Sequence, residues 1–241
     1  MVFLDDGGVL NDNECRAVEW RRLIGEYLSP RLGGTAEAWG EANRVVFDAQ
    51  WQRFEVWREQ AAPEEWDFFT SGEERQRWLR EMCQHVGVTA PTGEGCLRLA
   101  METEEYVLPR VRAAYPGAVD AVRELNVTGY RLSTASGQSS GELVHYLTGM
   151  DILSCFSERL YGPDLLRTRK ASSLFYERIF ADADIAPALA VVVDDSPEAV
   201  RWAAEVGART VLVSSGPAMP APDATISSLS ELSPLLERFT S

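Results

Sequence analysis

The chain has 241 residues, which fits one large domain or a medium domain that carries a smaller one, and excludes a peptide. Hydrophobic residues make up 45% and charged residues 25%, the balance of an ordinary globular protein. With 37 acidic and 23 basic residues the formal net charge is -14, which disfavours nucleic acid and anionic membranes as partners.

The sequence also bears on the compartment. Its longest apolar run, Ile185 to Val193, is far below the roughly 20 residues of a membrane-spanning helix. The N-terminal residues show no basic leader or small-residue cleavage site, so we expect a cytoplasmic protein. The cysteines lack the spacing of a zinc site or a disulfide framework, which indicates reduced thiols: Cys15, Cys83, Cys96 and Cys155. No feature indicates the number of subunits.

The first expected element is a short buried strand. The apolar run Val2 to Leu4 stops at two aspartates, and Gly7 and Gly8 then favour a turn. From about residue 11 the apolar residues follow the period of a helix, and Asn11 with Glu14 has the spacing of a capping box.

Helical patterns dominate the next part of the chain. Between about residues 11 and 115 no segment has the alternation typical of a strand. This block contains six of the seven tryptophans, which we interpret as packing between helices, the alternative being that some line a substrate pocket. Its arginines, such as Arg16, Arg44 and Arg53, are candidates for binding an anionic substrate.

Strands and helices alternate after about residue 115. Strands are expected at residues 130–133, near Leu160, and at residues 190–193, 210–213 and 225–226, with helices between them. Strands separated by helices of this length form parallel sheets. The sequence therefore predicts an α/β core domain of residues 1–12 and 113–241, interrupted by an all-helical domain of residues 13–112.

Chemically useful side chains follow the expected strands. In a parallel sheet the functional site lies beyond the carboxyl ends of the strands, so these residues should meet at one edge. Together they supply a carboxylate nucleophile, a hydroxyl, a cation and a carboxylate pair, which suits phosphoryl transfer. The clusters are Asp5-Asp6-Gly7-Gly8, Thr134-Ala135-Ser136, Lys170 (the single lysine of the chain) and Asp194-Asp195-Ser196.

These clusters resemble the four motifs of the haloacid dehalogenase (HAD) superfamily of hydrolases. Residues 3–10 are similar to its first motif, in which an aspartate after a strand is followed by x-Asp-Gly-Thr-Leu. Residues 132–136 resemble the second motif, Lys170 the third, and residues 191–196 the fourth. The resemblance implies a Rossmann-like three-layer core with a parallel sheet, and an inserted helical cap of the C1 type.

The resemblance also implies a role for each matched residue. Asp5 would be the nucleophile that forms a covalent intermediate on a small, anionic substrate. Thr134, Ala135, Lys170, Gly7 and Gly8 would hold the transferring group. Mg²⁺ would be the cofactor, because carboxylate and carbonyl oxygens suit this hard cation. Its ligands would be Asp5, the Gly7 carbonyl, Asp194 and Asp195.

The first motif departs from the family pattern at position 7. The family's phosphatases carry there a second aspartate that protonates the leaving group and then activates water, whereas this chain has Gly7. Asp6 is not expected to act as this acid, since neighbouring strand residues point to opposite faces. General acid-base help contributes about 10²–10⁴ in rate, so a phosphatase built in this way should be slow.

Three functions remain open from the sequence. The first, which we favour at this point, is Mg²⁺-dependent phosphoryl transfer, with the acid supplied by Asp12 or by the helical domain. The second is dehalogenase-like hydrolysis at carbon without a metal, because halide departs without a proton and the family's dehalogenases also lack the second aspartate. The third is a binding or regulatory protein with weak or absent catalysis.

Overall fold

A computed structural model describes residues 1–157, 159–216 and 222–240. The chain divides into two compact units, one made of residues 1–13 and 113–241 and the other of residues 14–112. The first unit is an α/β domain, and the second is helical. Within the described residues, no helix is both long and apolar enough to cross a membrane.

The α/β unit is built on one sheet of five parallel strands. Their order is β2-β1-β3-β4-β5, so the N-terminal strand lies inside the sheet. Leu4 at the end of β1 is in register with Thr134 of β2 and Val193 of β3, which brings the carboxyl ends of these three strands together. The strands are β1 (Val2–Leu4), β2 (Leu132–Thr134), β3 (Val191–Asp194), β4 (Arg209–Val213) and β5 (Ala224–Ile226).

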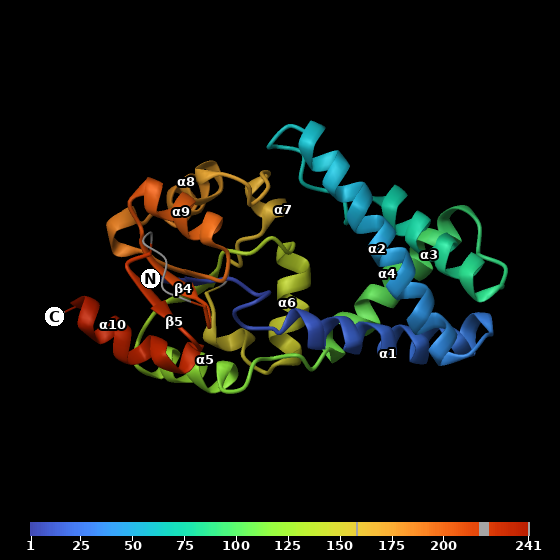
Figure 1. The fold of residues 1–241 in the computed structure, drawn as a ribbon, viewed down its shortest axis with the longest axis horizontal. Helices are drawn as coiled ribbons and strands as arrows, with labels where there is room; N and C mark the ends of the chain where they lie inside the picture. The colour runs from blue at the N-terminus through green and yellow to red at the C-terminus, as the bar shows by residue number, and fades with distance from the viewer. Residues whose placement is uncertain (158, 217–221, 241) are drawn as a thin grey trace. The chain divides into compact units, whose positions relative to one another are not determined.

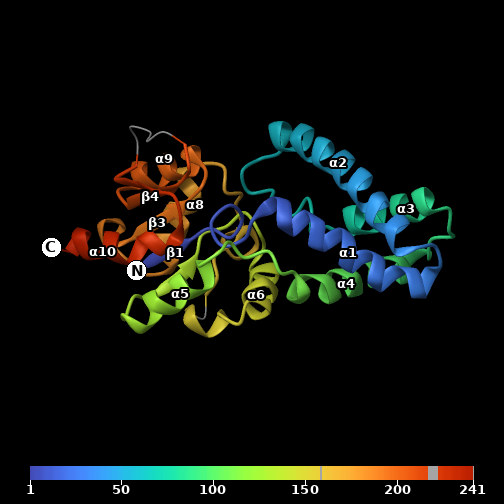
Figure 2. The ribbon, with the colours of Figure 1, turned by 60° about the horizontal axis from the view of Figure 1, so that its bottom comes forward.

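Helices cover both faces of this sheet (Figures 1 and 2). Val2 and Leu4 pack against the layer that contains α5, α6 and α10, whereas Phe3 packs against α8 and α9. This alternation follows from the period of two along a strand, and it confirms the three-layer α/β class. The helices are α5 (Ala118–Val127), α6 (Ser140–Gly149), α7 (Pro163–Leu166), α8 (Ser173–Asp182), α9 (Pro197–Val206) and α10 (Leu232–Thr240).

Two local expectations are wrong. Among its described residues, the segment near Leu160 forms isolated bridges, such as Ala135 with Tyr161, and no strand, because Pro163 starts α7 immediately afterwards. Asn11 does not cap the first helix, which begins at Asn13. Instead its side-chain amide donates a hydrogen bond of 2.7 Å to Asp6 Oδ1, where it compensates a fully buried carboxylate.

The helical unit contains four long helices. Trp39 is fully buried and donates its indole N–H to Gly33 O at 2.8 Å, and the buried Trp78 donates to Asn43 Oδ1 at 3.1 Å. These two tryptophans therefore pack between helices, whereas Trp51 keeps 44% of its surface exposed. The helices are α1 (Asn13–Leu32), α2 (Ala36–Gln60), α3 (Gly72–Val86) and α4 (Gly93–Val107).

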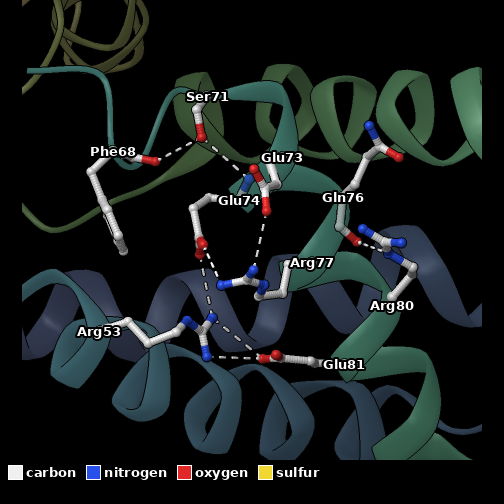
Figure 3. Close-up of polar contacts among 9 residues, drawn as sticks. All are labelled: Arg53, Phe68, Ser71, Glu73, Glu74, Gln76, Arg77, Arg80 and Glu81. Carbon is white, nitrogen blue, oxygen red and sulfur yellow. Dashed lines mark hydrogen bonds and ion pairs between the residues drawn. The ribbon is translucent and has the colours of Figure 1, made fainter. Parts of the chain in front are cut away.

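Charged side chains join α2 to α3 in this unit (Figure 3). The Arg53 guanidinium lies 3.4 Å from carboxylate oxygens of Glu74 and Glu81, and Arg77 donates to Glu74 at 2.7 Å. Arg44 pairs in the same way with two acidic neighbours on its own helix. Arg44 and Arg53, two of the arginines considered for binding substrate, are thus already neutralised by carboxylates.

Candidate active site

The nucleophile predicted by the sequence lies at the centre of the sheet edge. Asp5 directly follows β1, and its backbone N–H donates to Val193 O at 3.0 Å, which fixes it beside β3. Its side chain is buried, and Oδ1 lies 3.2 Å from Lys170 Nζ. The same ammonium lies 2.6 Å from Asp194 Oδ2. Three of the predicted site residues, from three separate segments, are therefore in direct contact.

Burial and charge act in opposite directions on this ion pair. Burial by itself lowers the pKa of Lys170, but the carboxylates of Asp194 and Asp5 outweigh it, so the pKa lies above its usual value. Burial raises the pKa of Asp194 to about 6, against the opposing effect of the Lys170 ammonium. Lys170 is therefore a cation at neutral pH, and Asp194 is a carboxylate.

Asp194 is held from three sides. Lys170 contacts Oδ2, the Tyr176 hydroxyl donates to the same oxygen at 3.4 Å, and the backbone N–H of Ser196 donates to Oδ1 at 3.0 Å. Tyr176 is fully buried on α8, and burial raises its pKa well above the usual value, so its hydroxyl stays protonated. The sequence assigned no role to Tyr176, which follows Lys170 in the segment that resembles the third motif, because an aromatic residue on a helix also suits core packing.

The three aspartates predicted as metal ligands lie close together. Carboxylate oxygens of Asp5, Asp194 and Asp195 are all within 4.8 Å of one another. Asp5 Oδ1 is buried, and within the part of the chain that the structure describes it takes no hydrogen bond, although it forms the ion pair with Lys170 at 3.2 Å. This donor set fits Mg²⁺, which prefers hard oxygen ligands. The Gly7 carbonyl remains a prediction as a fourth ligand.

A tight turn follows the nucleophile. The carbonyl of Asp6 accepts the backbone N–H groups of Leu10 and Asn11 at 2.9 and 2.8 Å. The Asp6 side chain is fully buried against Asn11, so it serves the turn and does not replace the missing acid at position 7. Gly8 has φ +81°, a left-handed conformation that favours glycine. A Cβ atom at position 8 would lie 2.0 Å from Asp195 Oδ2.

The residues after β2 are engaged by the backbone. The Thr134 hydroxyl donates to Tyr161 O at 3.3 Å, and the Ala135 N–H donates to Leu4 O at 3.0 Å. Both residues are fully buried, and they lie at the edge of the sheet next to the strand that leads to Asp5. The Thr134 hydroxyl and the Ala135 N–H are used for hydrogen bonds within the fold. Their contact with a substrate remains a prediction. Ser196 caps α9 by accepting from the backbone N–H of Ala199.

Comparisons with known proteins agree with this arrangement. Residues 167–232 match the model of a family described as HAD-hydrolase-like. These residues include Lys170, Asp194 at the end of β3 and Asp195 directly after it. No curated protein matches the chain.

Several solved structures share the fold over nearly their whole length. A 2-haloacid dehalogenase of Pseudomonas syringae pv. Tomato DC3000 is 21% identical, with a TM-score of 0.64 over 99% of this chain and 98% of that one. The L-2-haloacid dehalogenase of Xanthobacter autotrophicus is 17% identical, with a TM-score of 0.62 over 98% and 97%. A candidate HAD-hydrolase of Bacillus subtilis, solved with magnesium bound, is 15% identical, with a TM-score of 0.64 over 98% and 97%.

These structures have the same class of architecture, an α/β core with an additional helical part. The family match covers the segment that supplies the lysine and the aspartate pair. The chain therefore has the fold of these structures, an α/β core with an inserted helical unit, and its residues 167–232 match the HAD-hydrolase-like family model.

Proposed function

We propose that this protein is a hydrolase that attacks carbon through Asp5 and releases halide from a small halogenated carboxylate. The observation that carries the proposal is the environment of the nucleophile. Asp5 is buried beside the Lys170 ammonium, and no side chain at position 7 is present to protonate a leaving group. Halide departs as a stable anion, so the first step does not require an acid at position 7.

The geometry suggests how the first step proceeds. A carboxylate oxygen of Asp5 bonds to the carbon that carries the halogen, and halide leaves with the electron pair of the broken bond. Lys170, whose Nζ lies 3.2 Å from Asp5 Oδ1, attracts the anionic substrate toward the edge of the sheet. Asp194 holds the ammonium in place through its 2.6 Å contact. The product of this step is an ester between Asp5 and the substrate carbon.

The structural comparisons support this proposal over phosphate chemistry. Two of the similar structures described above are named as haloacid dehalogenases. Their names describe those proteins, and their likeness to this chain lies in the fold. We propose this chemistry for the chain because it has residues that the expected mechanism requires, above all Asp5 and Lys170.

Halide release from a panel of 2-haloalkanoic acids, including both enantiomers of 2-chloropropionate, tests the proposal. We expect release by the wild-type protein that continues in excess EDTA, because no step requires a metal. Absence of release from the whole panel, with the protein folded, would contradict the proposed function and favour a binding protein without turnover.

A second candidate function is Mg²⁺-dependent phosphoryl transfer, and one observation favours it. The cluster of Asp5, Asp194 and Asp195 has oxygen ligands within 4.8 Å of one another, which a dehalogenation without metal does not need. Bound there, Mg²⁺ would neutralise charge on a phosphoryl group. Asp5 would be the nucleophile, and Lys170 would orient the anionic group.

Metal binding is tested with Mg²⁺ alone. We expect millimolar Mg²⁺ to raise the unfolding temperature of the wild-type protein, because a ligand that binds only the folded state stabilises it. The rise should disappear in Asp195→Asn and persist in Asp184→Asn, which changes an exposed carboxylate away from the site. Equal shifts in all three proteins would show that Mg²⁺ does not use the cluster.

Restoring the missing carboxylate tests the phosphoryl-transfer candidate. Position 7 does not have the left-handed backbone of Gly8, so Gly7→Asp introduces no strain from a positive φ. If phosphoryl transfer is native to the site, hydrolysis of a generic aryl phosphate with Mg²⁺ should rise by about 10²-fold, since an acid-base group is restored. An unchanged rate would count against this candidate.

A further inference from the structure

The loop between β2 and α6 has two hydrogen-bond donors that no acceptor among the described residues takes up. We propose that these donors, the backbone N–H of Gly137 and the side-chain amide of Gln138, bind the carboxylate of the substrate. This inference rests on the proposed function, because it names the residues that recognise the acid group of the halogenated carboxylate. Both residues lie just beyond the segment that resembles the second motif.

Most donors of residues 135–140 already have an acceptor within the protein. This holds for the hydroxyls of the three serines in the loop and for every backbone N–H except that of Gly137. In the part of the chain that the structure describes, the Gly137 N–H and the Gln138 amide nitrogen donate to no protein atom, so the fold leaves them to water or to a ligand. The acceptors of the backbone N–H groups are Leu4 O for Ala135, Tyr161 O for Ser136, Ser136 Oγ for Gln138, Glu142 for Ser139 and Asp164 for Ser140.

Ser136 holds the amide of Gln138 in one orientation. The Ser136 hydroxyl donates to Gln138 Oε1 at 2.7 Å, and its oxygen accepts the Gln138 backbone N–H at 3.4 Å. Ser136 is fully buried, whereas Gln138 is partly exposed. Because the amide oxygen takes the hydroxyl proton, the amide nitrogen on the other branch is left for an acceptor outside the loop.

The two donors lie at the edge of the sheet that carries the nucleophile. Thr134, the last residue of β2, is in register with Leu4, and the Ala135 N–H donates to Leu4 O at 3.0 Å. Leu4 directly precedes Asp5. Gly137 is two residues beyond Ala135, which spans at most about 7 Å of chain. A Cβ atom on Gly137 would meet nothing within 4 Å, so the space beside this residue is open to a ligand.

Residues 161–164 fix the loop from its other side. The Ser136 N–H donates to Tyr161 O at 3.1 Å, and the Ser140 N–H donates to Asp164 Oδ1 at 2.8 Å. Gly162 packs so closely that a Cβ atom there would lie 2.2 Å from the carbonyl oxygen of Gln138. Donors that the fold already holds in place bind a ligand at a lower entropic cost than mobile ones.

The charges around Asp5 explain why a substrate carboxylate needs these donors. The Lys170 ammonium is shared between Asp5 and Asp194, and Asp195 adds a third carboxylate within 4.8 Å. An anion that approaches this cluster therefore meets more negative than positive charge. Two N–H donors match the two oxygens of a carboxylate, and hydrogen bonds to a charged group are the stronger kind.

Steady-state halide release from 2-chloropropionate separates recognition of the acid group from the chemistry. In Gln138→Leu, KM should rise about 10- to 100-fold, the range for a lost hydrogen bond to a charged group. The value of kcat should stay within about threefold, because the carboxylate is bound equally before and during the reaction. Gln138→Glu keeps the size of the side chain but repels the substrate, so KM should rise further. Gln84→Leu, an exposed position on α3, is the control and should leave both constants unchanged.

Ser136→Ala tests whether the orientation of the amide matters. Its KM should rise less than that of Gln138→Leu, since the amide is still present but no longer held. The double variant should have the KM of Gln138→Leu alone, because Ser136 acts through Gln138. Increases that multiply in the double variant would show that Ser136 does not position the amide.

The outcomes distinguish the inference from the proposed function. If the wild type releases halide but Gln138→Leu keeps the wild-type KM, or loses kcat alone, the inference is wrong and the proposed function stands. If the wild type releases no halide, the proposed function fails, and calorimetry with propionate then tests the inference. Propionate binding that weakens at least about tenfold in Gln138→Leu would support it, whereas equal binding or none would contradict it. A raised KM with kcat preserved supports both.

Discussion

Replacing the nucleophile with its amide, Asp5→Asn, should reduce turnover by at least about 10⁴-fold, because an amide does not attack carbon and the covalent route is lost. The effect should lie in kcat and not in substrate binding, since Lys170 remains to attract an anion. Turnover is measured as halide release under saturating substrate. The same substitution removes the attacking group for phosphoryl transfer, so the result tests the role of Asp5 for either leaving group.

Two observations make this result interpretable. The fold of Asp5→Asn should be retained, because Lys170 keeps its 2.6 Å contact with Asp194. Circular dichroism and the unfolding temperature check this directly. A folded variant that keeps more than a tenth of the wild-type rate would show that Asp5 is not the nucleophile.

Lys170→Met should impair both activity and stability. It leaves two buried carboxylates, Asp5 and Asp194, close together without the cation that neutralises them. Removing one partner of a buried ion pair costs about 3–5 kcal/mol, and we expect a loss of this size in the free energy of unfolding at pH 7. Turnover should fall by at least about 10³-fold, as positioned charges at a reacting centre contribute strongly.

The loss of stability in Lys170→Met should depend on pH in a defined direction. Burial already raises the pKa of Asp194 to about 6, and loss of the ammonium raises it further. A carboxyl group whose pKa is higher in the folded state than in the unfolded state destabilises the fold as the pH rises through that range. The difference in unfolding free energy from the wild type should therefore shrink between pH 7 and pH 5.

Lys170→Arg provides the control for charge alone. It should recover more of the stability than of the turnover, because a guanidinium keeps the charge but differs from a compact ammonium in shape. If Lys170→Met is as stable as the wild type at pH 7, the ion pair does not hold this site together.

The sequence predicted the edge of the sheet well because its signals are local. The apolar run before Asp194 and the short one before Asp5 each mark a buried strand that ends in carboxylates, and parallel pairing brings such ends together. The solitary lysine could be assigned by its place in the motif order. In the structure its Nζ lies 3.2 Å from Asp5 Oδ1 and 2.6 Å from Asp194 Oδ2, which belong to the first and fourth motifs.

Other features depend on contacts between distant segments and left no local signal. No pattern in the sequence indicates that the Asp195 carboxylate lies against Gly8, as it does in the structure. Tyr176 has the pattern of a core residue, and only the packing of α8 directs its hydroxyl to Asp194. The strand expected near Leu160 was wrong because short apolar runs do not distinguish paired from unpaired extended chain.

A single turnover in H₂¹⁸O tests the covalent mechanism at Asp5 most directly. With enzyme in excess over 2-chloropropionate, water attacks the carboxyl carbon of the ester, so the label should enter the Asp5 side chain. The hydroxyl of the product should carry unlabelled oxygen from the protein. Peptide mass analysis of residues around Asp5 and of the product gives both readings. Labelled product together with unlabelled Asp5 would show that water attacks the substrate itself, which would contradict the mechanism.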